Sequence, residues 1–137
     1  MRGQVQYRGA SFALVLNSAD DLRIYRTEAV ALPISEIAFA DSDDFVNGNR
    51  VRVNGTVDEW TEYTYSISLW IRDSNGYSVN VWIPRSVIDL TGMGVIGRMY
   101  EGMNITVEGA LKWYEAGRYS RWEIIPASSE DITEVRQ

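Results

Sequence analysis

Two tryptophans and one arginine stand where they could bind a flat or anionic ligand. Trp70, Arg72 and Trp82 lie in segments 66–72 and 78–84, where apolar and polar residues alternate. An indole ring stacks on a nucleobase, and a guanidinium can stack and also pair with a phosphate. All three residues fall on the polar side of the alternation. We therefore expect them on one face of a sheet, directed away from its core.

Four more residues complete the predicted binding face. Lys112, Tyr119 and Arg121 fall on the outer side of a second predicted hairpin, and Trp60 is expected at the rim. Three interpretations remain open. The face could bind single-stranded DNA or RNA, or it could dock a protein partner or a second copy, since Trp, Tyr and Arg are also enriched at protein interfaces. It could also be covered by residues 1–45.

The chain contains no histidine and no cysteine. The commonest general base, the commonest metal ligand and thiolate chemistry are therefore missing. Asp58, Glu59 and Glu62 cluster near one strand end and are expected to be solvated charge. The glycine pattern at 92–97 lacks the strand and helix that a dinucleotide site requires, so a connector is expected. We expect no enzymatic activity, no metal site and no cofactor.

The formal net charge is −6, and twelve of the thirteen cationic residues are arginines. Residues 46–126 carry a net charge of −1, whereas 1–45 carry −3 and 127–137 carry −2. A strong phosphate binder normally presents a basic surface. The charge therefore predicts a weak nucleic-acid binder that depends on stacking.

The hairpin within 64–84 has a predictable register. Residues 73–76, Asp-Ser-Asn-Gly, suit a type I turn followed by glycine in the left-handed region, which gives a three-residue loop. With that loop Ile71 faces Val79, so the aliphatic residues share one sheet face. Trp70 and Trp82 are then diagonal neighbours on the opposite face.

A second hairpin is expected from strands at 103–113 and 119–125. A four-residue turn at 114–117 would place Trp113 opposite Arg118, and Gly109 opposite an inward Trp122. Before the hairpins, 51–57 reads as a strand that bulges or bends at Gly55. Residues 85–100 could form a short helix and a glycine-broken loop.

The chain divides into three predicted parts. Residues 1–45 form an N-terminal extension with short strands near 4–7, 11–16 and 22–25, one helical turn at 27–32, and an acidic lead-in at 35–45. Residues 46–126 form the barrel, and 127–137 form a polar acidic tail. No apolar run approaches the roughly 18 residues of a membrane span, and a cytoplasmic location is expected.

Four segments carry a family resemblance through their order and spacing. They are 50–57, 69–79, 101–109, and 122–126 with the following 130–132. Together they resemble the OB domain, a five-stranded Greek-key barrel, and are most similar to its anticodon-binding and replication protein A type. The resemblance implies an all-β fold that binds single-stranded DNA or RNA on strands two and three, where Trp70, Arg72 and Trp82 fall. OB domains also dock proteins, so fold alone does not decide function.

Overall fold

A computed structural model describes residues 4–5, 12–15, 25–26 and 28–135. Two sheets are present in this part of the chain. The first contains β1 (Gln4–Val5), β2 (Phe12–Val15) and β3 (Tyr25–Arg26). The second contains β4 (Val30–Ala31), β5 (Arg50–Glu62), β6 (Ser66–Arg72), β7 (Ser78–Pro84), β8 (Asn104–Ala116), β9 (Tyr119–Ile125) and β10 (Ile132–Glu134). The helices are α1 (Ile34–Ala38), α2 (Arg85–Thr91) and the 3-10 turns η2 (Gly94–Arg98) and η3 (Ser129–Asp131).

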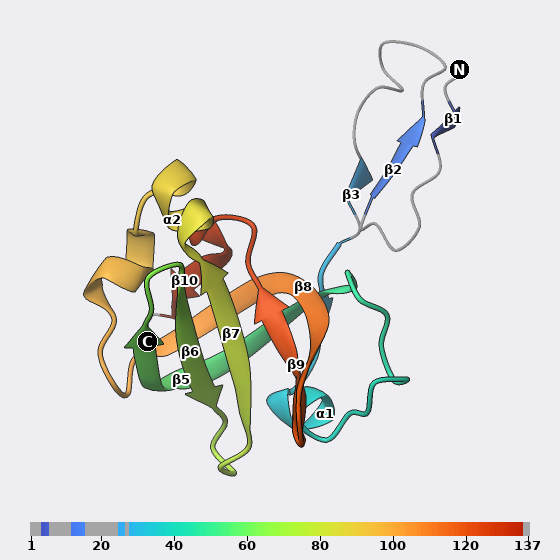
Figure 1. Ribbon diagram of the computed structural model, residues 1–137. Coiled ribbons are helices and arrows are strands. Elements are labelled where there is room, and N and C mark those ends of the chain that lie inside the picture. The colour runs from blue at the N-terminus through green and yellow to red at the C-terminus, as the bar shows by residue number, and fades with distance from the viewer. Residues whose placement is uncertain (1–3, 6–11, 16–24, 27, 136–137) are drawn as a thin grey trace.

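The larger sheet curls into a barrel (Figure 1). Its strand order is β10-β8-β9-β7-β6-β5-β4, and an additional antiparallel pairing of β5 with β8 closes the ring. The five strands β5–β9 are those that the sequence predicted, so the fold is an all-β barrel of the OB type. None of the helices in the described part of the chain could span a membrane.

The β6–β7 hairpin confirms the predicted register. Ile71 pairs with Val79 and Trp70 with Asn80, across a three-residue loop in which Gly76 has a φ of 91°. The aliphatic residues of both strands are buried in the barrel core. The tryptophans of both strands are therefore on the outer face, as the alternation predicted.

The β8–β9 register differs from the prediction by four residues. Trp113 pairs with Trp122, and the turn contains only Gly117 and Arg118, with a φ of 62° at the glycine. Residues 114–116, predicted as turn, instead extend β8. A two-residue turn with glycine first suits a tight hairpin. The even shift leaves every residue on its predicted sheet face, and Trp122 is buried as expected.

Residues 28–45 pack on the barrel differently from the prediction. The helical turn expected at 27–32 is wrong, because Val30–Ala31 pairs in parallel with β5. The helix α1 begins after Pro33, in the segment expected as an acidic lead-in. Its Ile34 and Ile37 side chains are buried in the core. Strands β7 and β9 pair at only two positions, and α1 contacts both strands near this short pairing.

The connector and the C-terminal segment form one layer beside the barrel. The glycine pattern at 92–97 forms η2 after the short helix α2, as a connector rather than a dinucleotide site. The segment predicted as a polar tail contains η3 and β10, and β10 pairs with β8. Ile132 of β10 is buried in the same core.

Candidate functional site

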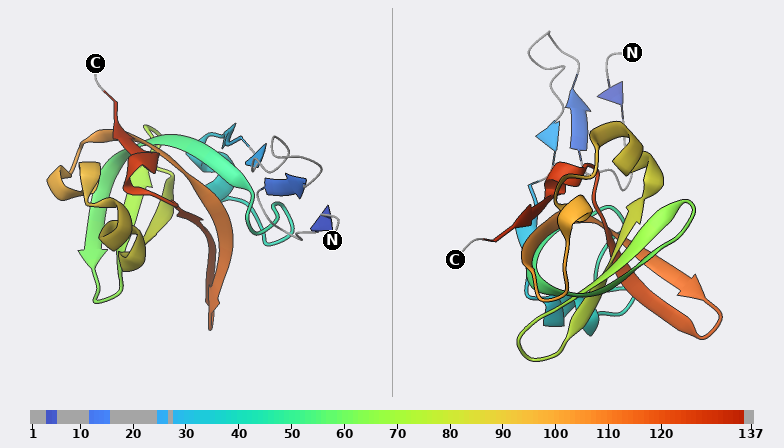
Figure 2. Two further views of the ribbon diagram at one scale, coloured as in Figure 1. Left: turned by 90° about the horizontal axis from the view of Figure 1, so that it is seen from above. Right: turned by 90° about the vertical axis from the view of Figure 1, so that its left-hand side faces the viewer.

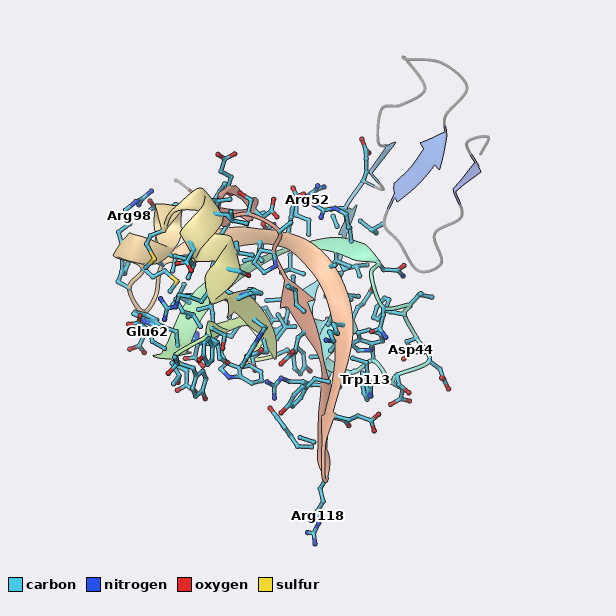
Figure 3. The ribbon with its side chains drawn as sticks, turned by 45° about the horizontal axis from the view of Figure 1, so that its top comes forward. Asp44, Arg52, Glu62, Arg98, Trp113 and Arg118 are labelled. Atoms are coloured by element: carbon cyan, nitrogen blue, oxygen red, sulfur yellow. The ribbon has the colours of Figure 1, made fainter. Side chains whose placement is uncertain are left out.

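The outer face of β6 and β7 lies between two projecting loops. The β5–β6 loop, residues 63–65, and the β8–β9 hairpin extend from the barrel on the same side (Figure 2). Arg118 marks the far tip of that hairpin, well away from the barrel body (Figure 3). The sheet between these projections forms a face bounded at both ends.

One row of residues crosses this face over five neighbouring strands. Pairing runs from Lys112 to Glu123, then to Asn80, Trp70 and Glu59. Asn80 and Glu123 are buried although they point outward from the barrel, with exposures of 0% and 4%. Neighbouring side chains therefore cover the polar middle of the row.

Arg121 lies in a cage of three aromatic rings. Its guanidinium carbon is 5.2 Å from the Trp70 ring centre, 4.9 Å from that of Tyr114 and 4.6 Å from that of Tyr119. Its Nη2 donates a hydrogen bond to Glu123 Oε2 at 2.8 Å. Cation–π contacts and an ion pair thus fix the guanidinium beside the Trp70 ring.

A second aromatic pair lies toward the β5–β6 loop. Tyr63 and Trp82 are stacked with ring centres 6.0 Å apart and an interplanar angle of 29°. Arg85 holds the loop, since its Nη2 donates to the Tyr63 carbonyl and its backbone N–H donates to the Tyr65 carbonyl. The Tyr65 side chain is 83% exposed. The face therefore carries aromatic groups from one bounding loop to the other.

Six of the seven predicted site residues lie on this outer face, and five of them belong to its aromatic and cationic surface. These five are Trp70, Trp82, Lys112, Tyr119 and Arg121. Arg72 shares the face, but its guanidinium pairs with Asp58 at 3.4 Å and borders a separate open groove of about 560 Å³.

Trp60 does not lie on the face. A register shift between Val57 and Glu59 places Trp60 opposite Leu69, so both residues share the inward side of the sheet. Trp60 lies near the barrel end, where it lines a depression with Met93 and Met99. The bulge lies at Asp58. At Gly55 the sequence predicted a bulge or a bend, and the pairing of β5 with β8 runs through this residue without a register shift. Gly55 is instead a close approach, since an added Cβ would lie 2.8 Å from Ile34 Cδ1.

Sequence reasoning missed three tyrosines of the face. Tyr63 and Tyr65 belong to the loop after β5, and Tyr114 belongs to β8 but was assigned to a turn. The sequence did contain a signal for Tyr63 and Tyr65. Both lie in a short loop between two strands, where side chains are exposed unless another segment covers them. Tyr114 could be placed only once the hairpin register was known.

Burial raises the pKa of Glu123 above its ordinary value of 4.5. The opposite charges of Arg121 and Lys112 and the hydrogen bond from Arg121 work against this increase. Desolvation penalises the charged carboxylate more than its partners compensate. Glu123 thus anchors Arg121 through an ion pair, although burial disfavours the charged form of the carboxylate that makes this pair. Among the described residues, no group of three carboxylates is placed to hold a metal ion.

Comparison with solved structures identifies the class of domain. The fold is similar to part of the Stn1–Ten1 complex of S. pombe, with a TM-score of 0.53 and 17% identity over 64% of this chain and 59% of that one. It is also similar to asparaginyl-tRNA synthetase from Pyrococcus horikoshii, with a TM-score of 0.51 and 24% identity over 66% of this chain and 20% of that one. At these identities the likeness shows the fold alone.

A third similar structure is an OBody, NL8, bound to hen egg-white lysozyme. Its TM-score is 0.51 with 17% identity, over 65% of this chain and 97% of the OBody. No known family model matches the sequence, and no curated protein matches it. The chain spans about three fifths of the Stn1–Ten1 chain and a fifth of the synthetase. The fold and these likenesses together define an OB-fold domain.

Proposed function

We propose that this OB domain is a non-catalytic module that binds single-stranded DNA or RNA across the outer face of β6 and β7. The observation that carries the proposal is the Trp70 ring with Arg121 fixed 5.2 Å from its centre. A base that stacks on an exposed aromatic ring contributes about 1–3 kcal/mol, whatever the sequence. Trp82 with Tyr63 offers a second stacking position on the same face.

The charges of the face support weak binding with a shallow salt dependence. Arg121 and Arg72 are already paired with Glu123 and Asp58, so neither is a bare cation for a phosphate. Lys112 and Arg118 are exposed and have no acidic partner within 4 Å in the described part of the chain. Few counterions would therefore be released on binding, and stacking would supply most of the affinity.

Titration with a short single-stranded oligo-dT at low salt tests the proposal. Tryptophan fluorescence should be quenched in a saturable manner, and a labelled oligonucleotide should show a matching rise in anisotropy. A duplex of the same length should compete poorly, because its bases cannot reach the rings. The absence of both signals at about 100 μM protein, the weak end of the usual range for non-specific binding, would overturn the proposal.

A protein-docking module is the second candidate. The observation in its favour is the OBody NL8, a domain of similar fold that is bound to a protein, lysozyme. The exposed tyrosines of the face and the net charge of −6 are also compatible with a protein partner. Light scattering separates the two candidates. Docking to a second copy predicts a dimer that oligonucleotides do not dissociate.

A further inference from the structure

A small cleft opens where β7 and β9 diverge. Its volume is about 210 Å³, and its walls come from α1, β6, β7 and β9. Ile37 and Ala38 of α1 give it one apolar wall, while Trp70 lines it from the sheet. Pockets for drug-sized ligands usually exceed about 300 Å³. The space therefore suits one small ring rather than a large ligand.

Two polar atoms of the residues that line this cleft are buried without a hydrogen-bond partner. They are the Oδ1 atom of Asn80 and the Nε atom of Arg121. Within the described residues these are the only buried side-chain atoms left unpaired. An unpaired buried polar atom is costly. Both atoms belong to residues that line the cleft, so a ligand that paired with them there would favour a small shift of the side chains that cover them.

The orientation of the Asn80 amide is fixed by its neighbours. Nδ2 lies 2.8 Å from Ser68 Oγ and 3.4 Å from the Leu69 carbonyl oxygen. A carbonyl oxygen can only accept, so the amide nitrogen must face it. The Oδ1 atom is thus left as a free acceptor. Arg121 Nε–H is a donor, because its guanidinium stays protonated in proteins.

We propose that the cleft is a subsite for one pyrimidine base of a bound single strand. The base would donate to Asn80 Oδ1 and accept from Arg121 Nε–H, with Trp70 beside it. Uracil and thymine present an N3–H donor next to carbonyl acceptors, and cytosine presents an amino donor next to the N3 acceptor. A purine offers similar edge groups but needs space for two rings. This inference rests on the proposed single-strand binding and adds a base preference to it.

Wild-type protein and three short oligonucleotides test the subsite. The probes are all-adenine DNA, the same strand with one central thymine, and the same strand with N3-methylthymine there. One thymine should tighten binding on the order of tenfold, the usual scale of a paired donor and acceptor at a base edge. N3-methylation removes the donor and should return the affinity to that of the all-adenine strand.

The Asn80→Leu variant tests the same subsite from the protein side. It removes the free acceptor with a side chain of similar size, so the fold should be retained. This variant should lose the thymine preference, so that its Kd values for the all-adenine strand and the thymine strand become equal. Asn75→Leu, in the exposed β6–β7 turn, is the matched control and should keep the preference.

The outcomes separate the subsite from the proposed function. Equal affinity for the all-adenine and thymine strands overturns the subsite and leaves single-strand binding intact. A thymine preference that survives N3-methylation also overturns it. No binding to any strand overturns both proposals and favours a protein partner. Should Asn80→Leu not fold, the methylated strand alone decides the question.

Discussion

Arg121 and Trp70 are held together from adjacent regions of the sheet, with the guanidinium carbon 5.2 Å from the ring centre. The arginine is also anchored by Glu123, whose carboxylate is buried. A side chain fixed before binding loses less rotamer freedom when a ligand arrives. The pair is therefore a preorganised platform rather than two mobile surface residues.

Replacing Trp70 by alanine should weaken single-strand binding by about 1–3 kcal/mol, because one stacking surface is lost. Trp60→Ala is the matched control, since Trp60 lies on the other side of the sheet and is 36% exposed. Its effect on affinity should be small. Fluorescence anisotropy of a labelled oligonucleotide measures both Kd values. Equal losses for the two variants would argue against the proposed face.

Arg118 should carry part of the salt dependence. It lies at the tip of the β8–β9 hairpin, far from Arg98 on the other side of the domain (Figure 3). Arg118→Gln should lower the slope of log K against log salt by about 0.7, the value for one phosphate contact on a single strand. Arg98→Gln, whose arginine pairs with Glu134, should leave the slope unchanged. An equal change of slope in Arg118→Gln and Arg98→Gln would indicate that the strand is attracted by the overall charge rather than by a contact with Arg118.

Glu123→Gln should change how stability depends on pH. Burial raises the pKa of Glu123, so the folded protein binds this proton more tightly than the unfolded chain does. Its contribution to the free energy of unfolding therefore falls as pH rises from 4.5 through the raised pKa. Relative to the variant, wild type should lose stability across that window and level off on either side. Urea denaturation at a series of pH values measures this difference.

If wild type instead gained stability relative to Glu123→Gln as the pH rises, the ion pair with Arg121 would outweigh the desolvation of Glu123. Lys112 lies opposite Glu123 on the neighbouring strand, and its positive charge partly opposes the increase in the pKa of Glu123. Lys112→Gln should therefore steepen the fall in stability, and this variant serves as an internal check on the sign.

Ile34→Ala should destabilise the barrel by about 2–5 kcal/mol, as for other large-to-small core changes. Ile34 is only 1% exposed and belongs to the same core as the barrel strands. Glu36→Ala, on the exposed side of the same helix, should change stability by less than about 0.5 kcal/mol. A near-zero effect of Ile34→Ala would mean that α1 is not part of the cooperative unit.

The sequence predicted the β6–β7 hairpin well because two independent signals agreed. Alternation set the faces, and the Asp73–Gly76 turn set the loop length. The β8–β9 register was wrong because a shift by an even number of residues leaves the alternation unchanged. Only the turn geometry could distinguish the two registers, and Gly117 fits both the predicted four-residue turn and the observed two-residue turn.

The candidate site was predicted only in part, for reasons that lie in single residues. Trp60 was misplaced because the bulge at Asp58 moves the residues after it to the opposite sheet face. The alternation of apolar and polar residues does not reveal such a bulge. The Arg121 cage and the unpaired atom of Asn80 depend on contacts between distant strands. No periodicity encodes such contacts, so only the structure reveals them.

The closing pair of strands has a consequence for how the chain reaches its native state. Arg50 pairs with Ala110, so the ring joins segments that are far apart in sequence. Proteins dominated by such high contact order fold slowly, on the order of milliseconds to seconds. A nascent chain that lacks β8 can form the β6–β7 ribbon but leaves one edge of β5 without its strand. Barrel closure should therefore be the late step of folding.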